Sequence, residues 1–190
     1  MDAPVSTYQE NFLSEDVQNL REWIESLENE SVTQEQAVES LPYDTYVMIN
    51  ELLPLDRNRR IDYAMKKDDI TFLLAIIGET PYQPASLISK GSHHLAFNCI
   101  SYLLDKVDLS NETDLNYLED AVFNVIRLYT SYNGDLIGNI VVTITNKLAS
   151  AINDPGLSYR EGTAIESIYN KMKVHIAQVD EINDLFNQPY

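Results

Sequence analysis

The sequence predicts an all-α protein. Apolar residues recur three and four positions apart in successive segments, which is the spacing of one face of an α-helix. Prolines, glycines and capping residues separate these segments at short intervals. We therefore expect eight or nine helices stacked as antiparallel pairs, either as an irregular armadillo- or HEAT-like α-solenoid or as a compact bundle, with a long C-terminal helix. The solenoid is favoured slightly, because several helices are apolar on more than one face.

The first predicted helix follows an N-terminal arm. Residues 1–13 are expected to form a flexible arm, and residues 14–190 a single helical domain. Ser14 is a favourable N-cap, and Glu15 and Asp16 in the first turn suit the positive end of the helix dipole. Helical spacing then continues through Val17, Leu20, Ile24 and Leu27, with Trp23 beside them.

Capping residues and prolines delimit the next three helices. Thr33 and Gln36 match a capping box before a short helix that Pro42 ends. The following helix stops at Pro54. Asp56 then caps a helix with apolar residues on its inner face.

The middle of the chain is expected to contain its longest loop. Asp68 is predicted to open a strongly apolar helix over residues 69–77, which Gly78 ends. Two prolines and a glycine in residues 79–91 predict a loop there, with at most one helical turn at 85–89.

Three further helices are predicted before the last one. Ser92 is expected to cap one that runs to Leu104, and the next is expected to end at Asn133-Gly134. Residues 137–152 contain a β-branched centre, but their helical spacing persists for four turns and no partner strand is visible.

The last helix begins at a Ser158/Glu161 capping box and carries a heptad seam. Packing of this seam against the protein's own helices is favoured over a coiled-coil dimer, because the run is short and contains a histidine. The seam residues are Ile165, Ile168, Met172, His175, Val179, Ile182 and Phe186.

Charge is the most unusual property of the sequence. Thirty acidic and 13 basic residues give a formal charge of −17. From Met1 to Asp56 there are 13 acidic residues and one basic residue, Arg21, whereas residues 57–190 contain 17 acidic and 12 basic residues. Such a surface repels nucleic acid and anionic membranes and accelerates encounters with basic proteins.

Known catalytic and ligand-binding motifs are absent from the sequence. It has no GxGxxG, P-loop, GxSxG, HExxH or EF-hand pattern. His93 and His94 are adjacent on a helix, so their side chains diverge by about 100°. The two side chains are therefore not expected to bind the same metal ion. Cys99 is expected to be a buried structural thiol. We predict no catalytic residue, no cofactor and no metal.

The absence of a signal peptide or a membrane-spanning run predicts a cytoplasmic protein with no membrane partner. A single cysteine fits a reducing compartment. The basic cluster Arg57, Arg59 and Arg60 is flanked by acids, and we interpret it as an intramolecular salt-bridge face. No nucleic-acid partner is therefore expected. The oligomeric state is open, with a monomer favoured.

These observations favour a binding function. In size, acidity and lack of a catalytic motif, the chain resembles bacterial immunity proteins as a class, although no specific motif carries the resemblance. This implies an immunity or antitoxin protein that neutralises a basic, nuclease-type toxin. Tyrosines add apolar area with a polar end, as protein interfaces favour. The predicted partner-binding residues are Glu15, Glu22, Glu25, Glu28, Glu30, Glu35, Glu39, Asp44, Tyr43 and Tyr82.

Two alternatives are open. A helical adaptor or viral host-modulating protein would bind an amphipathic helix, and it would need an apolar surface groove rather than an acidic one. A helical enzyme would need a cleft around a carboxylate or a histidine such as His93 or His94.

Overall fold

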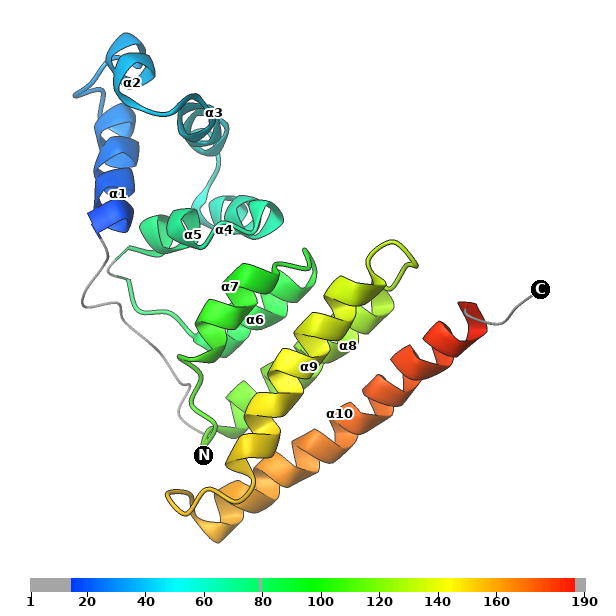
Figure 1. Ribbon diagram of the computed structural model, residues 1–190. Helices are drawn as coiled ribbons and strands as arrows, with labels where there is room; N and C mark the ends of the chain where they lie inside the picture. The colour runs from blue at the N-terminus through cyan, green and yellow to red at the C-terminus, as the bar shows by residue number, and fades with distance from the viewer. Residues whose placement is uncertain (1–14, 79, 187–190) are drawn as a thin grey trace. The chain divides into compact units, whose positions relative to one another are not determined.

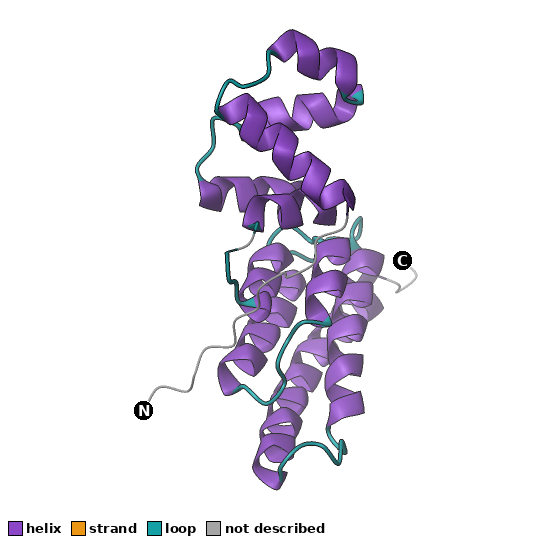
Figure 2. Cartoon of the chain, turned by 90° about the vertical axis from the view of Figure 1, so that its left-hand side faces the viewer, coloured by secondary structure: helices purple, strands orange, loops and turns teal. Residues whose placement is uncertain are grey.

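A computed structural model describes residues 15–78 and 80–186, without the side chains of Val179 and residues 181–186. These residues form ten α-helices joined by short connections, and the prediction of an all-α protein is confirmed (Figures 1 and 2). The predicted arm at residues 1–13 and the Ser14 cap lie outside the described residues. The helices are α1 (Glu15–Glu28), α2 (Gln34–Ser40), α3 (Tyr43–Leu52), α4 (Arg57–Lys67), α5 (Ile70–Ile77), α6 (Pro84–Ser92), α7 (Phe97–Leu104), α8 (Glu112–Arg127), α9 (Gly134–Ala151) and α10 (Tyr159–Phe186).

Contacts within the chain cluster into two compact units. The first unit includes residues 82–190 and the second includes residues 9–81. Each unit is described by itself below. The single helical domain expected from residue 14 onward stays a prediction.

The second unit contains α1 to α5. Helix α5 packs against both α1 and α4, and α2 packs against α3. Because α5 has neighbours on two sides, Phe72, Leu73, Leu74, Ala75 and Ile77 are all buried. This burial agrees with the prediction that the apolar segment 69–77 lies in the core.

The larger unit stacks its helices in two layers. Helices α6, α8 and α10 follow one another in one layer, and α7 and α9 lie against them in the other (Figure 1). The pairs α6–α7 and α8–α9 repeat the same arrangement, which is solenoid-like packing. The buried residues of α8 and α9 include Leu118, Val122, Ile140 and Ile144, and these fill the space between the layers.

Several predicted caps are present in the structure. The Thr33 hydroxyl accepts a hydrogen bond from the Gln36 amide, and the Gln36 side chain accepts one from the Thr33 amide. Ser158 and Glu161 form the same reciprocal pair. Asp56 accepts from the amide of Arg59 at the start of α4. These bonds satisfy donors that have no partner within the helix.

The prediction of a loop over residues 79–91 is wrong. Eight of those residues, 84–91, form helix α6 together with Ser92, and Pro84 is in the first turn of this helix. Proline is favourable there because its missing amide hydrogen would have no helical partner. Ser92 does not cap the next helix as predicted. It ends α6, is fully buried and accepts a hydrogen bond from Asn124.

Two other boundaries differ from the prediction. Asp68 has a left-handed φ of 51° and ends α4, whereas Asp69 caps α5 by accepting from the Phe72 amide. Helix α8 ends at Arg127 rather than near Asn133, and Gly134 begins α9. Polar residues such as Asp68 and Asn133 are favourable both before a helix and after one. The sequence therefore does not determine where these helices end.

The seam of α10 packs within the protein over its described part. Ile165, Ile168 and Met172 are buried, and α10 packs against α8 and α9. The side chains of Val179, Ile182 and Phe186 lie outside the described ones. Among the helices of residues 15–78 and 80–186, none has the length and apolar content needed to cross a lipid bilayer.

Candidate protein-binding surface

All eight predicted interface carboxylates are exposed in the structure. They lie on α1, on α2, at the start of α3 and in the turn between α1 and α2. Their exposure follows from the amphipathic pattern of these helices. In α1, Val17, Leu20, Ile24 and Leu27 are buried, so the intervening acidic residues point to solvent.

Few of these carboxylates are neutralised by basic residues of the described chain. Glu28 forms an ion pair with Arg60 of α4. Glu22 accepts a hydrogen bond from Gln18, an uncharged donor on the same helix. The other six form no ion pair with a described residue: Glu15, Glu25, Glu30, Glu35, Glu39 and Asp44. The negative potential of this surface is thus available to a partner.

An apolar pocket lies beside the acidic residues of α1. It has a volume of about 400 Å³. Leu20 and Trp23 of α1 and Phe72 of α5 contribute its apolar wall, and Asp16 and Asp69 are among its polar residues. The sequence pattern places Trp23 beside the buried face of α1 but does not indicate this pocket. The residues that complete the wall come from segments far apart in the chain.

The two predicted interface tyrosines differ in their exposure. Tyr43, the first residue of α3, is 75% exposed and lies next to Asp44. Tyr82 is only 7% exposed, so the expectation that it is exposed at an interface is wrong. It precedes α6, where the sequence predicted a loop and the structure has a buried helix. Tyr43 therefore remains a candidate contact, and Tyr82 does not.

The three arginines of α4 have separate roles. Arg59 lies 3.8 Å from Asp56, Arg60 pairs with Glu28, and Arg57 donates a hydrogen bond to the Thr80 hydroxyl at 3.3 Å. Two of the three arginines, Arg59 and Arg60, therefore form intramolecular ion pairs as predicted. Arg57 has no carboxylate partner among the described residues.

The three histidines lie in different surroundings. His93 and His94 are both exposed at the end of α6, and the His93 ring lies 3.3 Å from the Asn124 amide nitrogen. His175 of α10 lies 4.0 Å from Glu119 and stacks at a tilt on Phe123 of α8. The side chain of Cys99 is buried, as predicted.

The chain was compared with protein-family models, with curated proteins and with solved structures, and none of them matches it. The surface itself therefore has to carry the functional argument. Its physical content is a set of exposed carboxylates, one exposed tyrosine and an adjoining apolar pocket, all in one compact unit.

Proposed function

We propose that this protein binds and neutralises a basic protein through the acidic surface of α1, α2 and the start of α3, as an immunity or antitoxin protein does with a nuclease-type toxin. The observation that carries the proposal is that seven of the eight carboxylates are exposed without an ion pair to a described basic residue. Exposed carboxylates without an intramolecular cation leave a negative potential at this surface that attracts a basic partner.

The charge pattern suits rapid capture of a basic partner. Complementary potentials raise association rates above the usual range of about 10⁵–10⁷ M⁻¹s⁻¹. A nuclease presents a positive surface to its nucleic-acid substrate, and an acidic protein can cover that surface or an adjoining one. Covering it would block the substrate without any catalytic residue in the inhibitor.

Slow release requires contacts that lose their water on binding. Tyr43 is the exposed aromatic residue next to Asp44, and aromatic residues are common among the residues that dominate binding energy. The Trp23 pocket offers apolar area beside the carboxylates. A Lys or Arg side chain entering it would place its aliphatic stem on Trp23 and its charge near Asp16 and Asp69.

The same pocket supports the second candidate, a helical adaptor that binds an amphipathic helix. A groove is what that function needs, and the pocket has apolar walls from Leu20, Trp23 and Phe72. Dependence on salt separates the two candidates. Association through exposed charges weakens steeply as ionic strength rises, whereas apolar docking changes little.

The test is affinity capture of proteins from the native host on the immobilised chain, at about 0.05 M and about 0.5 M NaCl. We expect a basic protein that is retained at the lower salt concentration and released at the higher one. Its nuclease activity, measured on the purified protein, should be abolished by an equimolar amount of the chain. Capture that is unaffected by salt would favour the adaptor. A captured basic protein that keeps full activity in the complex would refute neutralisation.

A further inference from the structure

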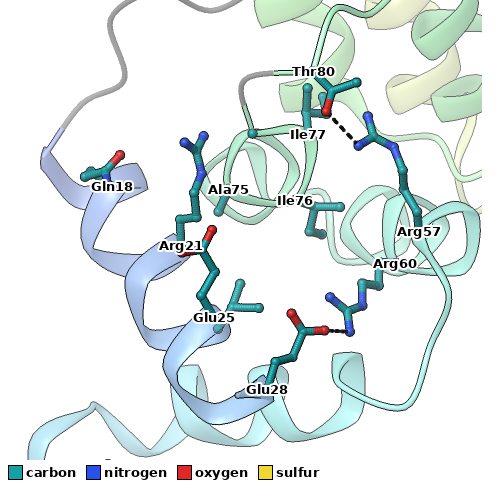
Figure 3. A pocket seen from close by; sticks show the side chains of 12 residues that line it. Gln18, Arg21, Glu25, Glu28, Arg57, Arg60, Ala75, Ile76, Ile77 and Thr80 are labelled. Atoms are coloured by element: carbon teal, nitrogen blue, oxygen red, sulfur yellow. Dashed lines mark hydrogen bonds and ion pairs between the residues drawn. The ribbon is translucent and has the colours of Figure 1, made fainter. Parts of the chain in front are cut away.

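A second cavity of the same unit has basic walls. It lies among α1, α4 and α5 and has a volume of about 480 Å³ (Figure 3). Arg21, Arg57 and Arg60 line it, and among the described residues the carboxylates in its lining are Glu25 and Glu28. A cluster of three arginines is unexpected here, because Arg21 is the only basic residue between positions 1 and 56.

One of the three arginines is engaged within the protein. Arg60 pairs with Glu28, and its guanidinium also donates to the carbonyl oxygens of Leu53 at 2.9 Å and Leu55 at 2.8 Å. Its charge is neutralised, and its Nε and Nη2 atoms donate hydrogen bonds within the chain. Arg60 and Glu28 therefore form a wall of the cavity rather than a free recognition group.

Arg21 differs from Arg60, because two of its donor atoms have no acceptor among the described residues. Its Nε and Nη2 atoms are buried and have no hydrogen-bond partner among the described residues. Glu25 follows it by one helical turn, a spacing that allows an ion pair, yet the two form none. A buried donor without an acceptor is unfavourable, and more so when it is charged. The described residues therefore supply no acceptor to these two donors.

The fold partly explains why Arg21 tolerates this position. Its guanidinium lies beside Gly78 at the carboxyl end of α5, so close that an added Cβ on Gly78 would be 3.7 Å from its central carbon. The negative end of the helix dipole favours a cation there. The dipole reduces the cost of the charge, but it does not satisfy the two buried donors.

Arg57 brings a second available guanidinium to the cavity. It donates one hydrogen bond to the Thr80 hydroxyl and forms no ion pair with a described residue. Figure 3 shows Arg21 and Arg57 both extending toward the Thr80 side of the cavity, with the Glu28–Arg60 pair at the opposite side. Two guanidinium groups that have no carboxylate partner among the described residues therefore line the same cavity.

We infer that this cavity binds an oxyanion group, a carboxylate or a phosphate, carried by a small molecule. The planar guanidinium fork matches both groups and can hold them through two parallel hydrogen bonds. The cavity volume lies within the range of small-molecule sites, and Ile24 and Ile76 give it apolar wall for the body of the ligand. This site does not depend on the proposed inhibitory function, since it uses the arginines rather than the acidic surface.

The inference is tested by NMR titration of the full chain with inorganic phosphate and, separately, with succinate as a dicarboxylate. Ionic strength is held constant with NaCl, so that general salt effects cancel. We expect saturable shifts of the Arg21, Gly78 and Thr80 amide signals with at least one of the two anions. Saturation by phosphate alone or by succinate alone would identify which oxyanion the cavity prefers.

Arg21→Gln and Arg57→Gln should each weaken the binding at least tenfold, whereas Arg59→Gln should leave it unchanged. Arg59 is the matched control, because it belongs to the same helix as Arg57 but is 75% exposed, pairs with Asp56 and does not line the cavity. Arg57 is exposed, so Arg57→Gln tests the site even where Arg21→Gln impairs folding. The inference is overturned by shifts that never saturate with either anion, or by equal affinity in Arg57→Gln and Arg59→Gln.

Discussion

At the residue scale, neighbouring arginines of one helix have different structural importance. Arg60 has a side chain that is 17% exposed and supplies donors to two carbonyl groups and to Glu28. Arg59 is 75% exposed and lies near only Asp56, one turn earlier. The sequence places both in one basic cluster, because the run from Arg57 to Arg60 does not show which side chain faces the loop between α3 and α4.

Arg60→Met should therefore lower the free energy of unfolding by about 2–4 kcal/mol, because two carbonyl groups and Glu28 lose a donor. Arg59→Met should change it by less than about 0.5 kcal/mol, as expected for an exposed side chain. Urea denaturation of the two variants and the wild type measures both values. Equal effects of the two substitutions would contradict the structure around Arg60.

Tyr63 gives a pH-dependent prediction at the same scale. Burial, followed by the hydrogen bond to Glu51 and the negative charge of Glu51, raises the pKa of Tyr63 above its ordinary value of 10.0. Below that pH the phenol is protonated in both the folded and the unfolded chain. Above it, only the unfolded chain loses this proton, so stability falls as the pH rises.

Tyr63→Phe removes this contribution. The loss of melting temperature between about pH 9 and pH 11 should therefore be smaller in Tyr63→Phe than in the wild type. Thermal denaturation followed by circular dichroism provides the comparison, with Tyr132→Phe as the control because Tyr132 is 98% exposed. An identical pH profile for the wild type and both variants would show that Tyr63 ionises normally.

At the scale of single elements, α6 shows where sequence reasoning fails. Pro81, Pro84 and Gly91 make the segment look like a loop. In the structure Pro84 lies in the first turn of α6, and Gly91 is buried near the end of the helix. Helix α6 packs against both α7 and α8, so tertiary contacts outweigh the weak helical propensity of its residues. The sequence pattern does not show that α6 packs against α7 and α8.

Hydrogen exchange can check α6 directly. The amides of residues 87–92 should exchange slowly, because they are hydrogen-bonded in a helix whose inner face is buried. Ser131 and Tyr132, in the connection between α8 and α9, should exchange much faster because they are exposed. Equally rapid exchange of both segments would contradict helix α6 and indicate a loop, as the sequence suggests.

Helices with a strong apolar period were predictable from sequence. The segments that became α1, α9 and the first half of α10 have their apolar residues buried as the spacing indicates. Their burial follows from the 3.6-residue period alone. Boundaries at polar residues, as at Asp68, depend on backbone geometry that the pattern does not determine.

At the scale of the whole molecule, the charge distribution was predictable and the cavities were not. The excess of acidic residues before Arg57 is visible in the sequence, and amphipathic helices place those residues outward. The Trp23 pocket and the arginine-lined cavity each combine residues from several helices of the second unit. A single sequence does not specify how those helices are packed, so neither cavity could be found from it.

Association kinetics test most directly whether the acidic surface of α1, α2 and the start of α3 is the docking surface. The rate is measured by stopped flow with the basic partner recovered by affinity capture, for the wild type, for Glu15→Lys/Glu22→Lys/Glu25→Lys and for Asp120→Lys/Glu166→Lys/Asp180→Lys. Both triple variants change exposed carboxylates and shift the net charge equally, but the second lies on α8 and α10. The account predicts association at least about tenfold slower for the first variant, with a much smaller effect of the second. An unchanged rate for the first variant, or equal slowing by both, would contradict it.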